Sequence, residues 1–93
     1  MEAVSEVAEF KNEVLRWSKR LRVQPRRIEV RRMARKWASC SPSGRICFSR
    51  DLISAELDFR IYVIVHELLH LRYPNHGRVF RRLLSAFSGV FAR

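Results

Sequence analysis

The segment of residues 58–72 constrains the fold more than any other part of the sequence. It is apolar on most faces at helical spacing, so it predicts a helix in the core, with Asp58 as its N-cap and Pro74 ending it. Within its most apolar part, residues 63–71, stand three ionisable side chains: His66, Glu67 and His70. A core helix tolerates such side chains poorly unless a partner compensates them. The sequence therefore predicts that the central helix is built around a polar site.

The three side chains form the pattern H-E-x-x-H, whose spacing suits a metal ion. Four residues of a helix turn through about 400° and rise about 6 Å, so His66 and His70 lie on one face as two ligands of one ion. Glu67 lies about 100° round the helix from His66, where it can reach a metal-bound water without binding the ion. Zinc lowers the pKa of such a water toward 7, and a carboxylate can accept its proton.

A catalytic zinc site usually has three protein ligands and an open position, so a third ligand is needed. His76, the remaining histidine of the chain, follows His70 by six residues, after a proline that turns the chain back. We expect His76 to be the third ligand. The alternatives are Glu56, which precedes the helix, and the thiols of Cys40 and Cys47, which a structural zinc site would recruit more often.

Two other interpretations of the motif stay open at this point. The ion could be structural, or the histidines and the glutamate could be core polar side chains that satisfy one another.

The remaining elements are read from the spacing of apolar residues, and together they predict an α+β fold of one domain, residues 1–93. A helix is expected over residues 3–21, a strand over 28–30, a hairpin over 37–48 and a loop or short turn over 51–56. Asn75 is expected to cap a last helix. Its predicted apolar stripe consists of Val79, Phe80, Leu83, Leu84, Phe87, Val90 and Phe91, with Arg78, Arg81 and Arg82 facing away.

The net charge of +10 is concentrated in two segments. Residues 16–36 hold ten basic residues and one glutamate, and residues 72–93 hold five arginines and no acid. Such blocks suit a polyanion or an acidic protein surface. The candidate nucleic-acid contacts are Arg26, Arg27, Arg31 and Arg32.

Compartment is inferred from what the sequence lacks. Two cysteines are too few for a secreted disulfide framework, and the longest apolar run, residues 61–65, is far too short to span a membrane. The first ten residues include acids where a signal peptide would have basic residues. We therefore expect a cytoplasmic protein with reduced thiols.

A family resemblance rests on four groups of residues. They are Arg32 to Ser41 (RMARKWASCS), Gly44-Arg45-Ile46 with Leu52, Tyr62 to Arg72 (YVIVHELLHLR), and Pro74-Asn75-His76 with Phe80. This set resembles the YgjP-like metallopeptidases, relatives of SprT-like zinc proteases and of minimal gluzincin-type scaffolds. The resemblance implies a minimal zincin-like domain with an N-terminal helix, a small three-stranded antiparallel or mixed sheet, an active-site helix and a C-terminal helix.

The resemblance also implies a function and its residues. The chain would be a zinc-dependent metallopeptidase with one Zn²⁺ per chain, held by His66, His70 and His76, and with Glu67 as the general base. Its substrate would be a polypeptide that pairs, extended, with an edge strand near the site. The alternative is a basic nucleic-acid-binding or protein-interaction module on the same scaffold, with weak or no protease activity.

Three further side chains are candidates for substrate contacts. Tyr62, one turn before His66, would stabilise an oxyanion, Trp37 would form a substrate platform, and Arg78 would hold a substrate carboxylate. The alternatives are core packing for the two aromatic residues and a solvated helix face for the arginine.

Overall fold

The computed structural model describes residues 2–89, with the side chains from residue 6 onward. The elements follow the order α1 (Glu2–Leu21), β1 (Arg27–Arg31), β2 (Ala38–Cys40), β3 (Arg45–Ser49), the 3₁₀-helix η1 (Arg50–Ser54), α2 (Leu57–Leu69) and α3 (Arg78–Ser88). The predicted α+β class, with three strands between helices, is confirmed. Within the described part of the chain, no helix combines the length and apolar character needed to cross a membrane.

Helix α1 lies against the sheet through one apolar face. Phe10 and Val14 are buried one turn apart, and the ring of Phe10 meets the ring of Phe48 on β3 edge-on, with centroids 5.3 Å apart. The helix ends at Leu21, and the next residue, Arg22, adopts the left-handed conformation with φ 59°. That conformation costs a non-glycine residue about 1 kcal/mol, and glycine is the usual residue there.

The sheet has the order β1-β3-β2, so β3 is central and β1 and β2 are the two edges. β3 pairs parallel with β1 and antiparallel with β2, which makes the sheet mixed. The predicted hairpin is the β2–β3 pair, turned at residues 41–44, where Gly44 has φ 93°. The positive φ favours a glycine at this position, and a Cβ added there would also lie only 3.1 Å from Cγ of Arg26, which would have to shift.

Helix α2 is the central helix that the sequence predicts, but both of its ends differ from the prediction. It begins after Glu56, and Asp58 lies in its first turn, where a carboxylate still favours the helix dipole. It ends at Leu69, with His70 as the C-cap residue, because the chain tightens into a turn before Pro74.

Helix α3 begins at Arg78 after Gly77, so the prediction that Asn75 caps it is wrong. The side chain of Val79 is 52% exposed, because it lies about 100° round the helix from the buried Phe80. Val90 and Phe91, the last two members of the predicted stripe, lie outside the described residues. The stripe packs on α1 through an edge-on contact of Trp17 with Phe87, whose centroids are 6.5 Å apart.

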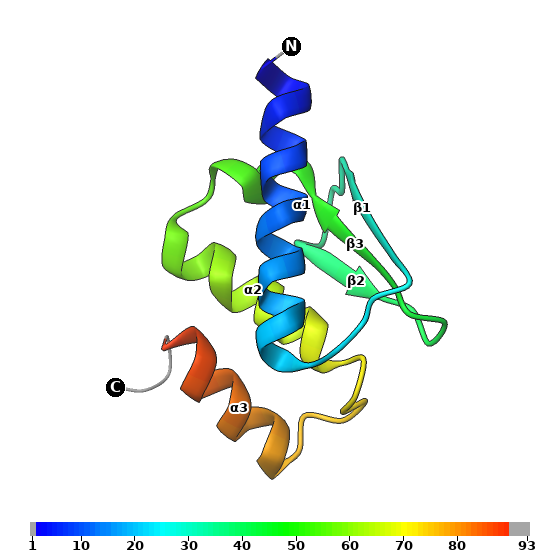
Figure 1. Ribbon diagram of the computed structural model, residues 1–93, viewed down its shortest axis with the longest axis vertical. Coiled ribbons are helices and arrows are strands. Elements are labelled where there is room, and N and C mark those ends of the chain that lie inside the picture. The colour runs from blue at the N-terminus through cyan, green and yellow to red at the C-terminus, as the bar shows by residue number, and fades with distance from the viewer. Residues whose placement is uncertain (1, 90–93) are drawn as a thin grey trace.

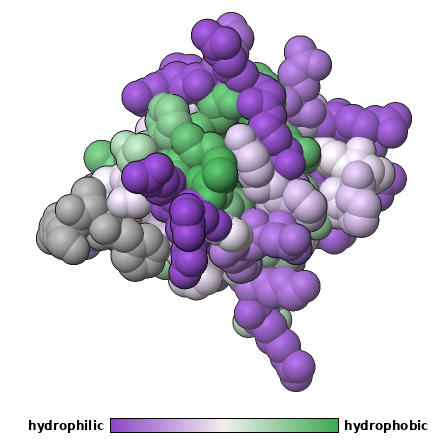
Figure 2. Space-filling model, turned by 90° about the horizontal axis from the view of Figure 1, so that it is seen from below, coloured by the Kyte–Doolittle hydropathy of each residue, from purple (hydrophilic) through white to green (hydrophobic). Residues whose placement is uncertain are grey.

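The helices and the sheet enclose one core. In Figure 1, α1 crosses in front of α2 and the sheet lies to one side. Helix α3 lies at the lower end of the molecule, near the C-terminal end of α1. Figure 2 views this lower end and shows hydrophilic side chains projecting around a hydrophobic area. The loop of residues 70–77 connects α2 to α3 at the same end, and it carries part of the candidate site.

Candidate metal centre

Helix α2 presents His66 and His70 on one face, as four-residue spacing requires. Their ring centroids are 4.9 Å apart, and both side chains are half-buried. The neighbouring positions Val65 and Leu69 are buried in the core and fix the orientation of this face. The helix thus directs two imidazoles to the same point at the surface.

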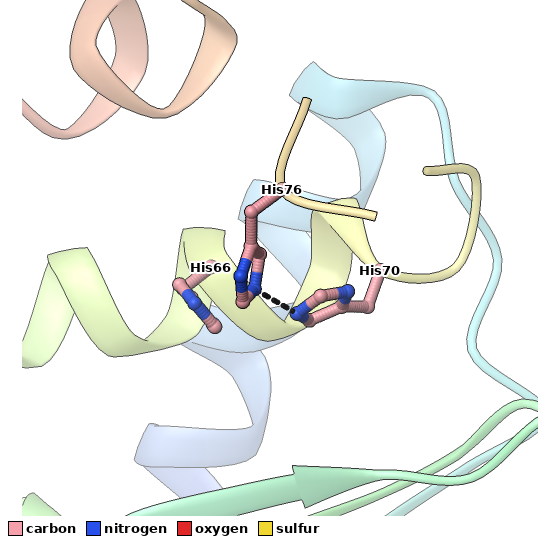
Figure 3. Close-up of side chains that lie close together, drawn as sticks. All are labelled: His66, His70 and His76. Carbon is pink, nitrogen blue, oxygen red and sulfur yellow. Dashed lines mark hydrogen bonds between the residues drawn. The ribbon is translucent and has the colours of Figure 1, made fainter. Parts of the chain in front are cut away.

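The third imidazole comes from the loop between α2 and α3. The ring of His76 lies 5.0 Å from that of His66 and 4.7 Å from that of His70, centroid to centroid. Its Nε2 is 2.9 Å from Nε2 of His70, and Figure 3 shows the three rings converging. His76 is exposed, so the site opens to solvent on its side.

The three histidines fit a divalent metal ion with nitrogen ligands. One ring nitrogen from each lies within 4.8 Å of the others. Tetrahedral ligands at about 2.0 to 2.1 Å from zinc lie about 3.4 Å from one another, so small side-chain adjustments reach that spacing. A catalytic zinc site usually has three protein ligands and one open position. Three imidazoles that face solvent on one side match that arrangement.

His70 is held in the state that can bind a metal. Its Nδ1 lies 3.3 Å from the carbonyl oxygen of Tyr73, which can only accept, so Nδ1 carries the proton and Nε2 offers its lone pair. Burial, followed by the nearby His66, lowers the pKa of His70, which favours the neutral imidazole. Hydrogen bonding and burial both prepare this residue as a ligand.

Phe80 forms the floor of the histidine cluster and was not singled out as a site residue from the sequence. It is buried, and its ring centroid lies 5.3 Å from that of His66 and 4.8 Å from those of His70 and His76. The apolar stripe of α3 marks Phe80 as a core residue, but the stripe alone does not reveal what it contacts. Through this ring, α3 supports all three imidazoles.

Glu67 lies beside the histidines. Its Oε2 is 3.2 Å from Nδ1 of His66, and its side chain is largely buried. Burial, and then the negative charge of Glu67, raise the pKa of Cys40 on β2. Helix α2 packs against the edge strand β2, and the carboxylate of Glu67 is close enough to that strand to act on the thiol of Cys40.

The other candidate ligands are separated from this cluster or belong to other contacts. Glu56 precedes α2, about 20 Å along the helix axis from His70. Cys47 is buried in β3, where Nε of Arg31 donates a 3.2 Å hydrogen bond to its sulfur. Both cysteines are free thiols.

The candidate substrate contacts surround the cluster at different places. Tyr62 is on α2, and its ring centroid is 5.8 Å from that of His66. Trp37 precedes β2, is 45% exposed, and packs edge-on against Phe59 with centroids 5.0 Å apart. Arg78 is exposed at the start of α3.

The four arginines predicted to contact nucleic acid have different surroundings. Nε of Arg27 pairs with Oε2 of Glu29 at 2.8 Å, Arg31 bonds to Cys47, and Arg32 lines a hollow near η1. Arg26 lines a separate groove beside His70. Nucleic-acid binding stays a prediction.

Comparison with known families gives this arrangement its context. The sequence matches the model of the YgjP-like metallopeptidase domain over residues 5–91. The chain belongs to the YgjP-like metallopeptidase family. No curated protein matches it. The family resemblance inferred from the sequence is therefore confirmed, and with it the classification as a metallopeptidase.

Two solved structures are similar to this YgjP-like chain. The crystal structure of the metallopeptidase zymogen of Methanocaldococcus jannaschii jannalysin is 25% identical in sequence, with a TM-score of 0.76 over 84% of this chain and 80% of that one. The metallopeptidase zymogen of Pyrococcus abyssi abylysin is 21% identical, with a TM-score of 0.70 over 82% of this chain and 76% of that one, and it supports the fold. The three helices and mixed sheet thus match the minimal zincin-like metallopeptidase fold.

Proposed function

We propose that the chain is a zinc-dependent metallopeptidase that holds one Zn²⁺ through His66, His70 and His76 and uses Glu67 as its general base. The observation that carries the proposal is the convergence of three imidazoles beside a largely buried carboxylate. Nitrogen ligands suit zinc, and a set of three leaves a position for water and substrate.

The roles within the site follow from where each side chain lies. When bound, zinc polarises the substrate carbonyl and brings the pKa of a coordinated water toward 7. Glu67 is the carboxylate next to the ligand cluster, so it receives the proton of the attacking water and passes it to the leaving amine. The hydrogen bond from His70 to the Tyr73 carbonyl keeps the ligand nitrogen free of a proton during this cycle.

The polypeptide substrate would lie along β2. This strand pairs with β3 on one side and forms an edge of the sheet on the other, and it packs against α2, the helix that carries Glu67. An extended peptide that adds to this edge would be held by backbone hydrogen bonds in a fixed register. Its scissile carbonyl would then face the histidine cluster.

The substitution Glu67→Gln tests the proposal, with Glu56→Gln as a matched control. Glu67→Gln keeps the shape and removes the proton acceptor, so we expect unchanged zinc content and a rate of casein digestion lower by about a hundredfold to ten-thousandfold. Glu56 is exposed before α2, so its substitution should leave both unchanged. Zinc is measured by elemental analysis and digestion by mass spectrometry.

The proposal is wrong if Glu67→Gln digests casein as fast as the original chain. It is equally wrong if the purified protein binds no zinc, or if the zinc-loaded chain cleaves no polypeptide.

A further inference from the structure

A groove of about 740 Å³ opens beside the histidine cluster. Its walls are the end of α1 with residues 22–26, the β2–β3 turn of residues 41–44, and residues 70–72 at the end of α2. His70 is one of the lining residues, so the groove and the candidate metal centre share a side chain.

The charged groups that line this groove all have one sign. They are Lys19, Arg22, Arg26 and Arg72, and all are exposed. No aspartate or glutamate lines it among residues 2–89. The hollow near η1 differs, since its lining includes Glu6 and Asp51 together with arginines. The groove beside His70 therefore favours an anion, and the hollow near η1 does not select by charge.

The backbone around the groove is fixed by three hydrogen bonds. Nη2 of Arg72 donates to the carbonyl oxygen of Arg22 at 2.6 Å, which ties the end of α2 to the end of α1. The amide of Arg26 donates to the carbonyl of Gly44 at 2.8 Å, and the amide of Val23 donates to the carbonyl of Ser18 at 3.0 Å. These bonds fix the backbone that carries Arg22 and Arg26, and they hold the guanidinium of Arg72 in place before any ligand binds.

Arg22 occupies a backbone position at which folding alone would favour glycine. Its φ of 59° lies in the left-handed region, where glycine is the usual residue. Arg72 binds the main-chain carbonyl of Arg22, which a glycine at this position would provide equally well. The side chain of Arg22 is exposed and lines the groove. Its contribution is thus a positive charge at this place.

The groove also continues the predicted path of the substrate. β2 ends at Cys40, and the next four residues form the turn that walls the groove. A peptide paired with the free edge of β2 would pass the histidine cluster and enter the groove within a few residues of the scissile bond. A side chain or chain end at that point would meet the four cations.

We propose that this groove binds a carboxylate of the polypeptide substrate and so makes the enzyme prefer acidic substrates; the proposal rests on the peptidase function above. The carboxylate would come from an aspartate or glutamate side chain or from the C-terminus of the substrate. Arginine and lysine bind carboxylates through charge-assisted hydrogen bonds, which are stronger than bonds between neutral groups.

A nucleic acid suits the groove less well than a peptide carboxylate. Binding of a nucleic acid draws on a track of cations along several phosphates. Arg27 and Arg31 lie on β1, the edge of the sheet opposite β2, so they do not extend the groove. The cations of the groove lie on the end of α1, on residues 22–26 and at Arg72, all around one hollow beside His70.

The test measures binding to the zinc-loaded Glu67→Gln chain, so that the probes stay intact. The probes are fluorescein-labelled octapeptides of three kinds: one with glutamate at alternate positions and an amidated end, one with glutamine there and an amidated end, and the glutamine peptide with a free C-terminal carboxylate. We expect the glutamate peptide, the free-acid peptide or both to bind at least about tenfold more tightly than the neutral one. Tighter binding of the glutamate peptide would assign the groove to acidic side chains, and tighter binding of the free-acid peptide would assign it to the C-terminus of the substrate.

Variants locate the preference in the groove. Arg22→Gly removes the charge and suits the left-handed backbone, so it should keep the melting temperature and reduce the preference below about threefold. Lys19→Gln, on the exposed end of α1, is a second groove variant that should reduce the preference. Arg50→Gln is the control, at an exposed arginine outside the groove. It removes one positive charge, as each groove variant does, and it should leave the preference for carboxylate peptides unchanged.

Three results would overturn the proposal: equal binding of all peptides, a preference that survives both groove variants, or a ten-nucleotide oligo-dT that binds more tightly than the glutamate peptide and is lost in Arg22→Gly. The last would assign the groove to nucleic acid. Because binding is measured without cleavage, a chain that shows the preference and cleaves no polypeptide would refute the peptidase function and leave the carboxylate groove standing.

Discussion

His76 is the one member of the histidine cluster that no helix holds in place. Its side chain is exposed in the loop between α2 and α3, and it reaches the other two imidazoles because the chain turns back after Leu69. His66 and His70 are spaced by the helix itself. Replacing His76 therefore tests the assignment of the third ligand with little effect on the core.

We expect His76→Ala to weaken zinc binding by more than about a hundredfold. Loss of a contact that only supports a ligand already costs about tenfold to hundredfold, and this substitution removes the ligand itself. The measurement is a competition titration against a chromogenic chelator. Asn75→Ala, at the exposed neighbouring position, is the control and should bind zinc as the original chain does. Unchanged affinity in His76→Ala would mean that the third ligand lies elsewhere.

The lowered pKa of His70 predicts how the metal-free protein responds to pH. In the unfolded chain this histidine takes up a proton near pH 6.5, whereas in the folded chain burial delays protonation to a lower pH. Between those two values the unfolded state binds more protons, so stability falls as the pH decreases. Urea unfolding of the metal-free protein at pH 7 and pH 5 should show a larger loss for the original chain than for His70→Gln. An equal loss in both would contradict the assigned environment of His70.

At the residue scale, the sequence alone predicts what depends on local geometry. The relation of His66 to His70 follows from the pitch of a helix, which is the same in every helix. The supporting contacts of Phe80 depend on how α3 packs against α2, and no local pattern encodes that packing. Side chains that support a site are therefore harder to predict than the groups that form it.

At the scale of elements, α3 supports the site through Phe80. Replacing this buried ring with alanine should destabilise the protein by about 3 to 5 kcal/mol and loosen all three imidazoles, so that zinc affinity also falls. Phe80→Leu fills more of the space and should cost less in both. The control is Val79→Ala, at a half-exposed position, which should change stability by no more than about 0.5 kcal/mol. Denaturant unfolding and zinc titration measure the two effects, and a Phe80→Ala chain with unchanged zinc affinity would show that α3 does not support the ligands.

The ends of the elements were harder to predict than the elements. Asp58 and Asn75 are residue types that favour N-caps, yet the helices start after Glu56 and Gly77. Neither start has a side-chain cap, so tertiary packing of the apolar faces decides where each helix begins. The hairpin, in contrast, was predicted from its turn residues, because Gly44 satisfies a local backbone requirement.

At the scale of the whole molecule, contacts between distant segments unite the site and the groove. Nε of Arg60 on α2 pairs with Oε1 of Glu13 on α1 at 3.0 Å in a largely buried position, and Arg72 ties the ends of the same two helices together. The parallel pairing of β1 with β3 belongs to the same class of long-range contact. Charge runs in the sequence mark residues 16–36 as basic, but they do not show that some of these arginines meet beside His70 while others lie on the opposite edge of the sheet.

A chain of 93 residues buries a modest core, so a bound metal should contribute a large share of its stability. A ligand that binds only the folded state at a hundred times its dissociation constant stabilises by about 2.7 kcal/mol, and 1 kcal/mol shifts the melting temperature of a domain this size by about 4 to 8 °C. Since the three histidines join α2 to the loop before α3, removing zinc with EDTA should lower the melting temperature by about 10 °C or more. Calorimetry measures the shift, excess zinc should restore it, and magnesium should not, because magnesium prefers oxygen ligands. A melting temperature that EDTA leaves unchanged would show that the fold does not depend on a metal held by these histidines.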